Sequence, residues 1–163
     1  MIASVAHDAD FEANEKGSNV KVFVMDYAIV EGDQNLIRSA VENVLRNAVR
    51  FTAAETSVEV RLETSEIDER GSAIISIRDH GPGVPEEELP HIFKAFYRVT
   101  DAGSRSSKGV GLGLSITERI VRLHEGQLRA ANMPGGGLQV EIELPLSADV
   151  QAMSIKSSIP RTA

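Results

Sequence analysis

The chain contains no cysteine and no tryptophan, and aromatic residues make up only 4% of its 163 residues. The absence of cysteine excludes disulfide bonds, thiolate catalysis and cysteine-ligated metal centres. Because aromatic side chains are so scarce, aliphatic side chains must supply most of the core. The length fits one domain and leaves little room for a second.

Positive charge is also in short supply, since 17 Lys and Arg face 24 Asp and Glu and give a formal net charge of −7. This balance opposes broad binding to nucleic acid or to anionic membranes. The sequence has no run of about 18 apolar residues, and its first residues lack the basic flank and apolar centre of a signal peptide. We therefore expect a domain in the cytoplasm with no direct membrane contact, which holds any anionic ligand by a local arrangement of groups.

Three segments differ in composition. Residues 1–17 are polar and acidic with a sparse apolar pattern, which predicts the tail of a helix whose main body lies upstream. Residues 18–147 are expected to form one folded unit. Residues 148–163 lack sustained periodicity and are expected to be a disordered tail.

Within the folded unit, β-branched or alternating runs predict strands at 19–25, 57–65, 72–79, 126–133 and 136–146. Apolar residues at helical spacing predict helices at 34–50, after a start at Gly32 and Asp33, and at 113–126, where Gly126 is expected to end the helix. Pro85 is placed where a first helical turn would start. The expected architecture is α+β, a two-layer sandwich with one mixed sheet covered by helices on one face.

The stretch KGVGLGLSI at 108–116 has three alternating glycines. A Rossmann fingerprint must follow a strand directly with the spacing G-x-G-x-x-G, and a Walker loop needs a Gly-Lys pair, so neither is supported. Two interpretations remain. The stretch is either a cradle of backbone N–H groups at a helix N-terminus or a flexible hinge, and its own residues favour neither.

Polar residues on the first long helix bear on that choice. Asn43, Asn47 and Arg50 fall at i, i+4 and i+7 and so share one stripe beside the buried face. Amide oxygen is a suitable ligand for Mg²⁺, and arginine suits phosphate oxygens. The alternative is a merely solvated helix face, which would favour Glu and Lys.

A carboxylate stands at the end of the third predicted strand, where the stretch DHGPGVP at 79–85 begins. Gly81 and Gly83 remove side chains directly after Asp79, which would leave its carboxylate facing open space. A carboxylate in such a position can accept a hydrogen bond from an exocyclic amine such as that of adenine. An ordinary Asp-Gly turn is the alternative.

Taken in order, these stretches resemble a known family. ENVLRNAVRFT (42–52), DHGPGVP, IFKAFYR (92–98), KGVGLGLSI and PGGG (134–137) are similar to the N, G1, F, G2 and G3 boxes of the GHKL ATP-binding (Bergerat) fold, in its sensor histidine kinase branch. The resemblance spans residues 18–146 and looks closest to the Cpx-type envelope-stress sensor kinases. It implies a Bergerat sandwich, ATP and Mg²⁺ as ligands, and a flexible ATP lid at 99–108.

The resemblance also implies roles for single residues. Asn47 would hold Mg²⁺, Asn43 would support the phosphates, and Arg98 would contact the γ-phosphate, so that Asn43 and Arg98 are the candidate catalytic residues. The remaining candidate ATP-binding residues are Arg50, Phe51, Asp79, Gly81, Gly83, Val84, Tyr97, Arg105, Lys108, Gly109, Val110, Gly111, Leu112, Gly113 and Leu114.

One departure separates this chain from the ATPases of the fold, which place a glutamate four residues before the metal-binding asparagine. Here that position is Asn43, and Glu42 is rotated by about 100° around the helix. An amide cannot act as a general base near neutral pH. This favours transfer of the phosphate to a protein nucleophile over hydrolysis.

The nucleophile is not recognisable in the chain, because none of His7, His80, His91 and His124 stands in the family's phosphoacceptor motif. The resemblance therefore implies a catalytic domain alone, with residues 1–17 as the end of a linker from an absent dimerisation and phosphoacceptor domain. Expected partners are that domain and a response regulator. The isolated domain is expected to be a monomer, and the full-length membrane-bound kinase a homodimer.

Two alternatives keep the fold. One is a stand-alone serine kinase and binding module similar to the anti-sigma factors, and the other is a degenerate nucleotide sensor without transfer activity.

Overall fold

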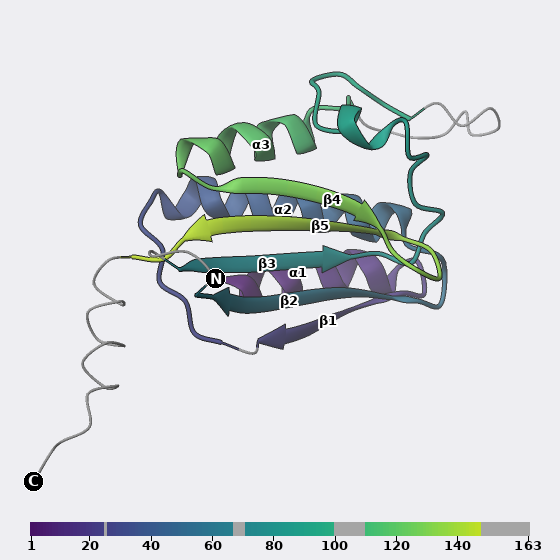
Figure 1. The fold of residues 1–163 in the computed structure, drawn as a ribbon. Helices are drawn as coiled ribbons and strands as arrows, with labels where there is room; N and C mark the ends of the chain where they lie inside the picture. The colour runs from purple at the N-terminus through teal and green to yellow at the C-terminus, as the bar shows by residue number, and fades with distance from the viewer. Residues whose placement is uncertain (25, 67–70, 100–109, 148–163) are drawn as a thin grey trace, which may run out of the picture.

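The computed structural model describes residues 1–24, 26–66, 71–99 and 110–147 (Figure 1). Its helices are α1 (Ile2–Asn14), α2 (Gln34–Phe51) and α3 (Gly113–Leu123), with a short 3₁₀ turn at Leu89–His91. Its strands are β1 (Asn19–Val24), β2 (Ser57–Ser65), β3 (Ser72–Arg78), β4 (Gln127–Asn132) and β5 (Leu138–Pro145). Most of the predicted lid and the predicted tail at 148–163 lie outside the described residues.

The strands form one five-stranded sheet in the order β1-β2-β3-β5-β4. β1 runs parallel to β2, and the other neighbouring pairs are antiparallel. β3 and β5 therefore lie inside the sheet, each with a neighbour on both sides. The sheet is mixed, as the sequence predicted.

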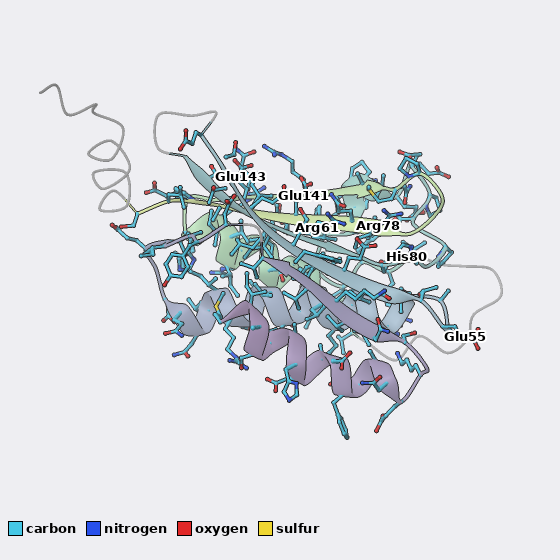
Figure 2. All side chains as sticks on the ribbon, turned by 90° about the horizontal axis from the view of Figure 1, so that it is seen from below. Glu55, Arg61, Arg78, His80, Glu141 and Glu143 are labelled. Atoms are coloured by element: carbon cyan, nitrogen blue, oxygen red, sulfur yellow. The ribbon has the colours of Figure 1, made fainter. Side chains whose placement is uncertain are left out.

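The helices cover one face of this sheet. In Figure 1, α1 and α2 lie behind the strands, and α3 lies next to α2 above β4. Figure 2 views the two layers from below, with the helices on one side of the sheet and Arg61, Arg78, Glu141 and Glu143 on the other. The predicted two-layer α+β sandwich is confirmed. No helix in the described ranges is long and apolar enough to cross a bilayer.

The core lies between the two layers and is almost entirely aliphatic. Every second residue of the central strands is buried, as the burial of Ile75 and Ile77 on β3 and of Val140 and Ile142 on β5 shows. α2 adds a buried stripe that consists of Ile37, Ala40, Val41, Val44, Leu45, Ala48 and Val49. This one-sided stripe leaves the opposite side of α2 free to carry polar residues.

α2 begins and ends at well-defined residues. The Asp33 carboxylate caps its N-terminus, because Oδ1 accepts hydrogen bonds from the backbone N–H groups of Asn35 at 2.8 Å and Leu36 at 3.1 Å. The helix ends at Phe51, and the N–H of Thr52 still bonds to Ala48 O. The sequence predicted this helix and its start correctly.

α1 packs against α2 and β1. Its residues Val5, Ala6 and Ala13 are buried, whereas Phe11 is 73% exposed. The carboxylate of Asp10 accepts a hydrogen bond from the N–H of Val20 at 2.7 Å and so ties α1 to β1. The first helix thus shares the core, and the assignment of residues 1–17 to a linker in a longer protein stays a prediction.

The end of α3 differs from the prediction. The helix ends at Leu123, and the residue in the left-handed conformation is Glu125, with φ of 58°. Gly126 has a different role, since a Cβ there would lie 2.2 Å from the backbone oxygen of Glu143. Gly126 therefore permits close contact with β5. The helical turn expected at Pro85 is limited to a bonded turn and the 3₁₀ turn at Leu89–His91.

Candidate functional site

The polar stripe of α2 meets the first turn of α3. Asn43 and Asn47 are half-buried on α2. A Cβ placed on Gly113, the first residue of α3, would lie 3.8 Å from Cβ, Cγ and Oδ1 of Asn43. The structure thus brings together two motifs that are separated by a large part of the chain. The N-terminal N–H groups of α3, which lack intrahelical acceptors, start beside this amide.

Arg50 continues the stripe toward the end of α2. Its guanidinium carbon lies 5.2 Å from the centre of the Phe51 ring, close enough for a cation–π contact. Its Nη2 atom is buried and has no hydrogen-bond partner among the described residues. A buried donor without an acceptor is unfavourable. The arrangement therefore fits an anionic or polar ligand that accepts this hydrogen bond.

Asp79 lies directly after β3 and is only 4% exposed. Its Oδ1 accepts hydrogen bonds from the N–H groups of Gly81 at 2.8 Å and Leu138 at 3.2 Å. Its Oδ2 accepts none from the part of the chain that the structure describes. Burial raises the pKa of the Asp79 carboxyl, and the two N–H donors oppose this rise. Oδ2 therefore remains available for an amine donor on a ligand.

Glycines allow the backbone to close around Asp79. A Cβ on Gly81 would lie 2.2 Å from the backbone oxygen of Phe51. A Cβ on Gly137, which has a φ of 90°, would lie 1.9 Å from the backbone oxygen of Asp79. Only glycine permits these approaches, which bring the end of α2, the end of β3 and the start of β5 together.

Asn132 is a residue that the sequence analysis missed. Its Nδ2 donates to Val84 O at 2.6 Å and to Glu86 Oε1 at 3.0 Å, and its Oδ1 accepts from Val84 N at 2.9 Å. A Cβ on Gly83 would lie 2.7 Å from the same Oδ1. Asn132 thus holds the loop after Asp79 in place. The only sequence signal is an amide at a strand end shortly before a Pro-Gly turn.

Thr52 is a second missed residue. Its hydroxyl oxygen accepts a hydrogen bond from the N–H of His80 at 3.2 Å and lies 2.8 Å from the Thr56 hydroxyl oxygen. It joins the segment after α2 to the residue that follows Asp79. The position of the Asp79 carboxylate is therefore fixed from both sides of the loop.

The segment at 92–98 contacts the start of the α3 region. The N–H of Phe96 donates to Gly111 O at 2.9 Å, and a Cβ on Gly111 would lie 2.7 Å from Tyr97 O and 3.2 Å from Arg98 Cγ. The Tyr97 hydroxyl donates to the Glu88 carboxylate, which raises the pKa of Tyr97. Tyr97 is thereby turned toward the 85–91 segment, and Arg98 lies beside Gly111.

The other predicted residues group around the start of α3. Val110 is 67% exposed, Leu112 is the residue before the helix, and Leu114 packs against the core. Val84 packs against the core as well. The predicted residues Arg105, Lys108 and Gly109 lie outside the described residues. Across the described ranges, no group of three or more His, Asp or Glu side chains is arranged to hold a metal ion.

The described site has two ends with different chemistry. A buried carboxylate with one free oxygen lies at the ends of the central strands. The amides of Asn43 and Asn47 and the guanidinium of Arg50 lie in this order along α2, with Asn43 beside the start of α3. A ligand that carries an amine at one end and anionic groups at the other matches this order.

Comparison with known proteins agrees with this geometry. A family model described as histidine kinase-, DNA gyrase B-, and HSP90-like ATPase matches residues 32–148. The chain belongs to this family, and within it to the catalytic, ATP-binding domains of two-component sensor histidine kinases. The predicted family, fold and kinase branch are confirmed.

Individual relatives define the branch more narrowly. The chain is 39% identical over 145 residues to the sensor histidine kinase CpxA of Escherichia coli strain K12, a match that covers 88% of this chain and 30% of CpxA. It is 32% identical over 136 residues to the signal transduction histidine-protein kinase BaeS of the same strain, with 83% of this chain and 28% of BaeS covered. The chain thus spans less than a third of the length of these relatives.

Solved structures show the same fold. The mycobacterial sensor histidine kinase MprB matches with a TM-score of 0.70 and 30% identity over 89% of this chain and 95% of that chain. Full-length ShkA, solved in complex with AMPPNP, matches with a TM-score of 0.71 and 30% identity over 89% of this chain and 29% of that chain.

Proposed function

We propose that this chain binds ATP together with Mg²⁺ and transfers the γ-phosphate to a histidine on a dimerisation domain outside residues 1–163. ATP binding follows from the family to which the chain belongs. The proposal goes further, to the binding of Mg²⁺, the roles of single residues, the acceptor histidine and the partner proteins.

At the adenine end, Asp79 would accept a hydrogen bond from the exocyclic amine through Oδ2. The support is that Oδ1 is already bonded to Gly81 and Leu138, so the carboxylate is fixed in orientation. Gly81, Gly83 and Val84 would line this end, where Asn132 holds the loop. A preorganised acceptor loses little entropy when the ligand arrives.

At the phosphate end, Asn47 would supply one oxygen ligand to Mg²⁺, and phosphates and water would supply the others. Mg²⁺ is commonly bound in this way, with few protein ligands. The residues present fit such an ion, because the half-buried Asn43 and Asn47 carry neutral amide oxygens on one stripe of α2, and Asn43 lies against the start of α3. When bound, the ion would neutralise charge on the phosphates. Arg50 and Phe51 would line the nucleotide, and Arg98 would contact the γ-phosphate beside the backbone from Gly109 to Leu114.

One observation carries the proposal of transfer over hydrolysis. Asn43, and not a carboxylate, contacts the start of α3. The neighbouring Glu42 is engaged elsewhere, since its Oε1 accepts a hydrogen bond from Arg38 Nε at 2.6 Å. Arg38 in turn pairs with Asp8 of α1 at 2.9 Å. These contacts support a site without a general base for water on α2.

We also propose that this chain is part of a longer protein. The matched relatives are more than three times longer than the matched segment, and the remaining length would supply a dimerisation domain with the phosphoacceptor histidine. We expect this chain to be a cytoplasmic portion of a membrane-bound homodimer that passes the phosphate on to a response regulator.

Labelled ATP tests the proposal. The chain is incubated with ATP labelled on its γ-phosphate, Mg²⁺ and the separately produced dimerisation domain of the same kinase. We expect acid-labile label on that domain and none on a variant whose acceptor histidine is replaced by glutamine. Acid-stable label would indicate phosphoserine, and release of free phosphate at the same rate without an acceptor would indicate an ATPase. Either result would overturn the proposal.

A further inference from the structure

α3 is joined to α2 by a fully buried hydroxyl. Thr117 is 0% exposed, and its Oγ1 lies 3.0 Å from Gly113 O in its own helix and 3.3 Å from Ala40 O in α2. A hydroxyl has one proton, which these two carbonyl oxygens share. Ala40 lies three residues before Asn43, and Gly113 is the first residue of α3. The hydroxyl thus connects the first turn of α3 to the turn of α2 that precedes Asn43.

A histidine makes a second connection at the other end of α3. His124 Nδ1 lies 2.8 Å from Ile120 O, and Nε2 lies 3.1 Å from the backbone nitrogen of Asp33, the residue that caps α2. The carbonyl can only accept and the N–H can only donate, so both bonds need the neutral ring with its proton on Nδ1. Gly32 makes room for this ring, because a Cβ there would lie 2.1 Å from His124 Cδ2.

The two connections lie on one face of α3. Gly113, Thr117, Ile120 and His124 follow one another at i, i+4, i+7 and i+11, which is the stripe of a single helix face. The hydrogen bonds of Thr117 and His124 lie at different positions along the axis of α3. Together they fix the rotation of α3 about its axis and its position along α2. They therefore also fix the distance between Gly113 and Asn43.

We propose that Thr117 and His124 are positioning residues, which hold α3 along α2 so that its first N–H groups meet the phosphates beside Asn43. This inference rests on the proposed function, since it concerns the phosphate end of the same site. A shift of α3 by one residue would move its N-terminus by about 1.5 Å, half the length of a hydrogen bond. Asp79 is held by the sheet and would be left in place.

Matched pairs of variants separate the hydrogen bonds from the shape of the side chains. Thr117→Val keeps the branched shape and removes the hydroxyl, whereas Thr117→Ser keeps the hydroxyl. His124→Asn keeps a donor near the Nδ1 position and cannot reach Asp33, whereas His124→Gln places an amide oxygen near the Nε2 position. Each pair thus contains one variant that loses the bond to α2 and one that keeps it.

The readout is a comparison of two ligands of the whole chain by NMR titration, a non-hydrolysable ATP analogue with Mg²⁺ and adenosine. We expect Thr117→Val and His124→Asn to weaken binding of the ATP analogue about threefold to tenfold, the range of one lost hydrogen bond. Adenosine affinity should stay within about twofold of wild type, because the adenine end does not depend on α3. Thr117→Ser and His124→Gln should bind both ligands much as wild type does.

Three results would reject the inference. Unchanged affinity for the analogue in Thr117→Val and His124→Asn would show that the bonds position nothing. Equal weakening of both ligands would show a general loss of structure, which thermal melting would confirm. Failure of the wild-type chain to bind the analogue would reject the proposed function, and this inference with it. If Thr117→Val does not fold, the His124 pair decides.

Discussion

The side-chain amide of Asn132 pairs with both backbone groups of Val84, since it accepts a hydrogen bond from the Val84 N–H at 2.9 Å and donates one to the Val84 carbonyl at 2.6 Å. The side chain thereby takes the place of a neighbouring strand and satisfies both backbone groups of a loop residue. The two residues are 48 positions apart in the chain. Through this contact β4 supports the loop that follows Asp79.

Loss of these two hydrogen bonds should destabilise the loop after Asp79, at the proposed adenine end of the site. Asn132→Asp removes the donor to Val84 and places a carboxylate next to that of Glu86, with which Asn132 Nδ2 is bonded at 3.0 Å. We expect a several-fold loss of ATP affinity and a lower melting temperature. Calorimetric titration and amide exchange at Val84 measure both effects. Gln127→Ala, on an exposed position of the same strand, is the control and should change neither.

The free oxygen of Asp79 leads to a second prediction. Asp79→Asn can keep an acceptor for Gly81 and Leu138 only by placing its NH₂ group at the Oδ2 position, where it cannot accept a hydrogen bond from the amine of the ligand. ATP affinity should fall about tenfold to a hundredfold, measured by calorimetric titration. Asp26→Asn is a suitable control, because Asp26 is bonded to Thr64 away from this site. Equal losses in the two variants would contradict the assigned role of Asp79.

The same substitution should have the opposite effect on the stability of the ligand-free chain. Burial raises the pKa of Asp79 in the folded state above its ordinary value of 3.8, so the ionised form destabilises the fold at neutral pH. Asp79→Asn is therefore expected to melt a few degrees higher than wild type at pH 7.

The sign of this effect gives a pH profile. The favourable contribution of the protonated carboxyl is fully present below the unfolded-state pKa and is lost as pH rises through the raised folded-state pKa. The gap between Asp79→Asn and wild type should thus shrink as the pH falls from 7 toward 4. A gap that is constant across this range would show that ionisation of Asp79 is not its cause.

A fourth prediction concerns the metal. Asn47→Ala should remove most of the gain in nucleotide affinity that Mg²⁺ provides, because it deletes the proposed oxygen ligand. Titration with the nucleotide in the presence of Mg²⁺ or of EDTA measures that gain. Arg46→Ala, on the neighbouring exposed position of α2, should retain it. A full Mg²⁺ effect in Asn47→Ala would exclude Asn47 as the ligand.

Two glycines of the PGGG turn allow the cost of backbone strain to be measured apart from the cost of a steric clash. Gly135 and Gly137 have φ angles of 88° and 90°, but a Cβ on Gly135 would meet nothing within 4 Å, whereas one on Gly137 would lie 1.9 Å from Asp79 O. Gly135→Ala should lower the free energy of unfolding by about 1–2 kcal/mol. Gly137→Ala should cost more than about 3 kcal/mol and weaken ATP binding as well. Urea denaturation compares the two variants, and equal losses would contradict the close approach to Asp79.

The sequence predicts the parts of this fold that depend on local pattern. The alternating strand at 57–65 and the helix from Asp33 onward have the predicted bounds to within a residue, because each carries its periodicity in its own residues. The packing of α1 is less visible, since two of its buried residues are the alanines Ala6 and Ala13, which give a weak apolar signal. Its only aromatic residue of the Phe, Tyr or Trp type, Phe11, lies outside the core.

The residues of the candidate site likewise fall into those that the sequence predicts and those that it does not. The motif residues at Asn43 and Asp79 could be named from the sequence, because their residue types and spacing resemble a family. Asn132 and Thr117 could not, since each acts through a contact with a residue distant in the chain, Val84 in one case and Ala40 in the other. Such contacts follow from the packing of whole elements, which no local pattern contains.

The bonds of Asp79 to the start of β5 have a consequence for how the molecule moves. Asp79 N donates to Leu138 O at 3.0 Å, and Leu138 N donates to the Asp79 carboxylate, so this end of the site belongs to β3 and β5, two strands inside the sheet. Hydrogen bonds between core strands generally open only in the largest unfolding events of a domain. Asn43 faces α3, which packs mainly against α2 and also contacts β4 and β5. The end of the site that would recognise the base is thus part of the sheet itself, whereas the end that would hold the phosphates depends on how one helix packs against another.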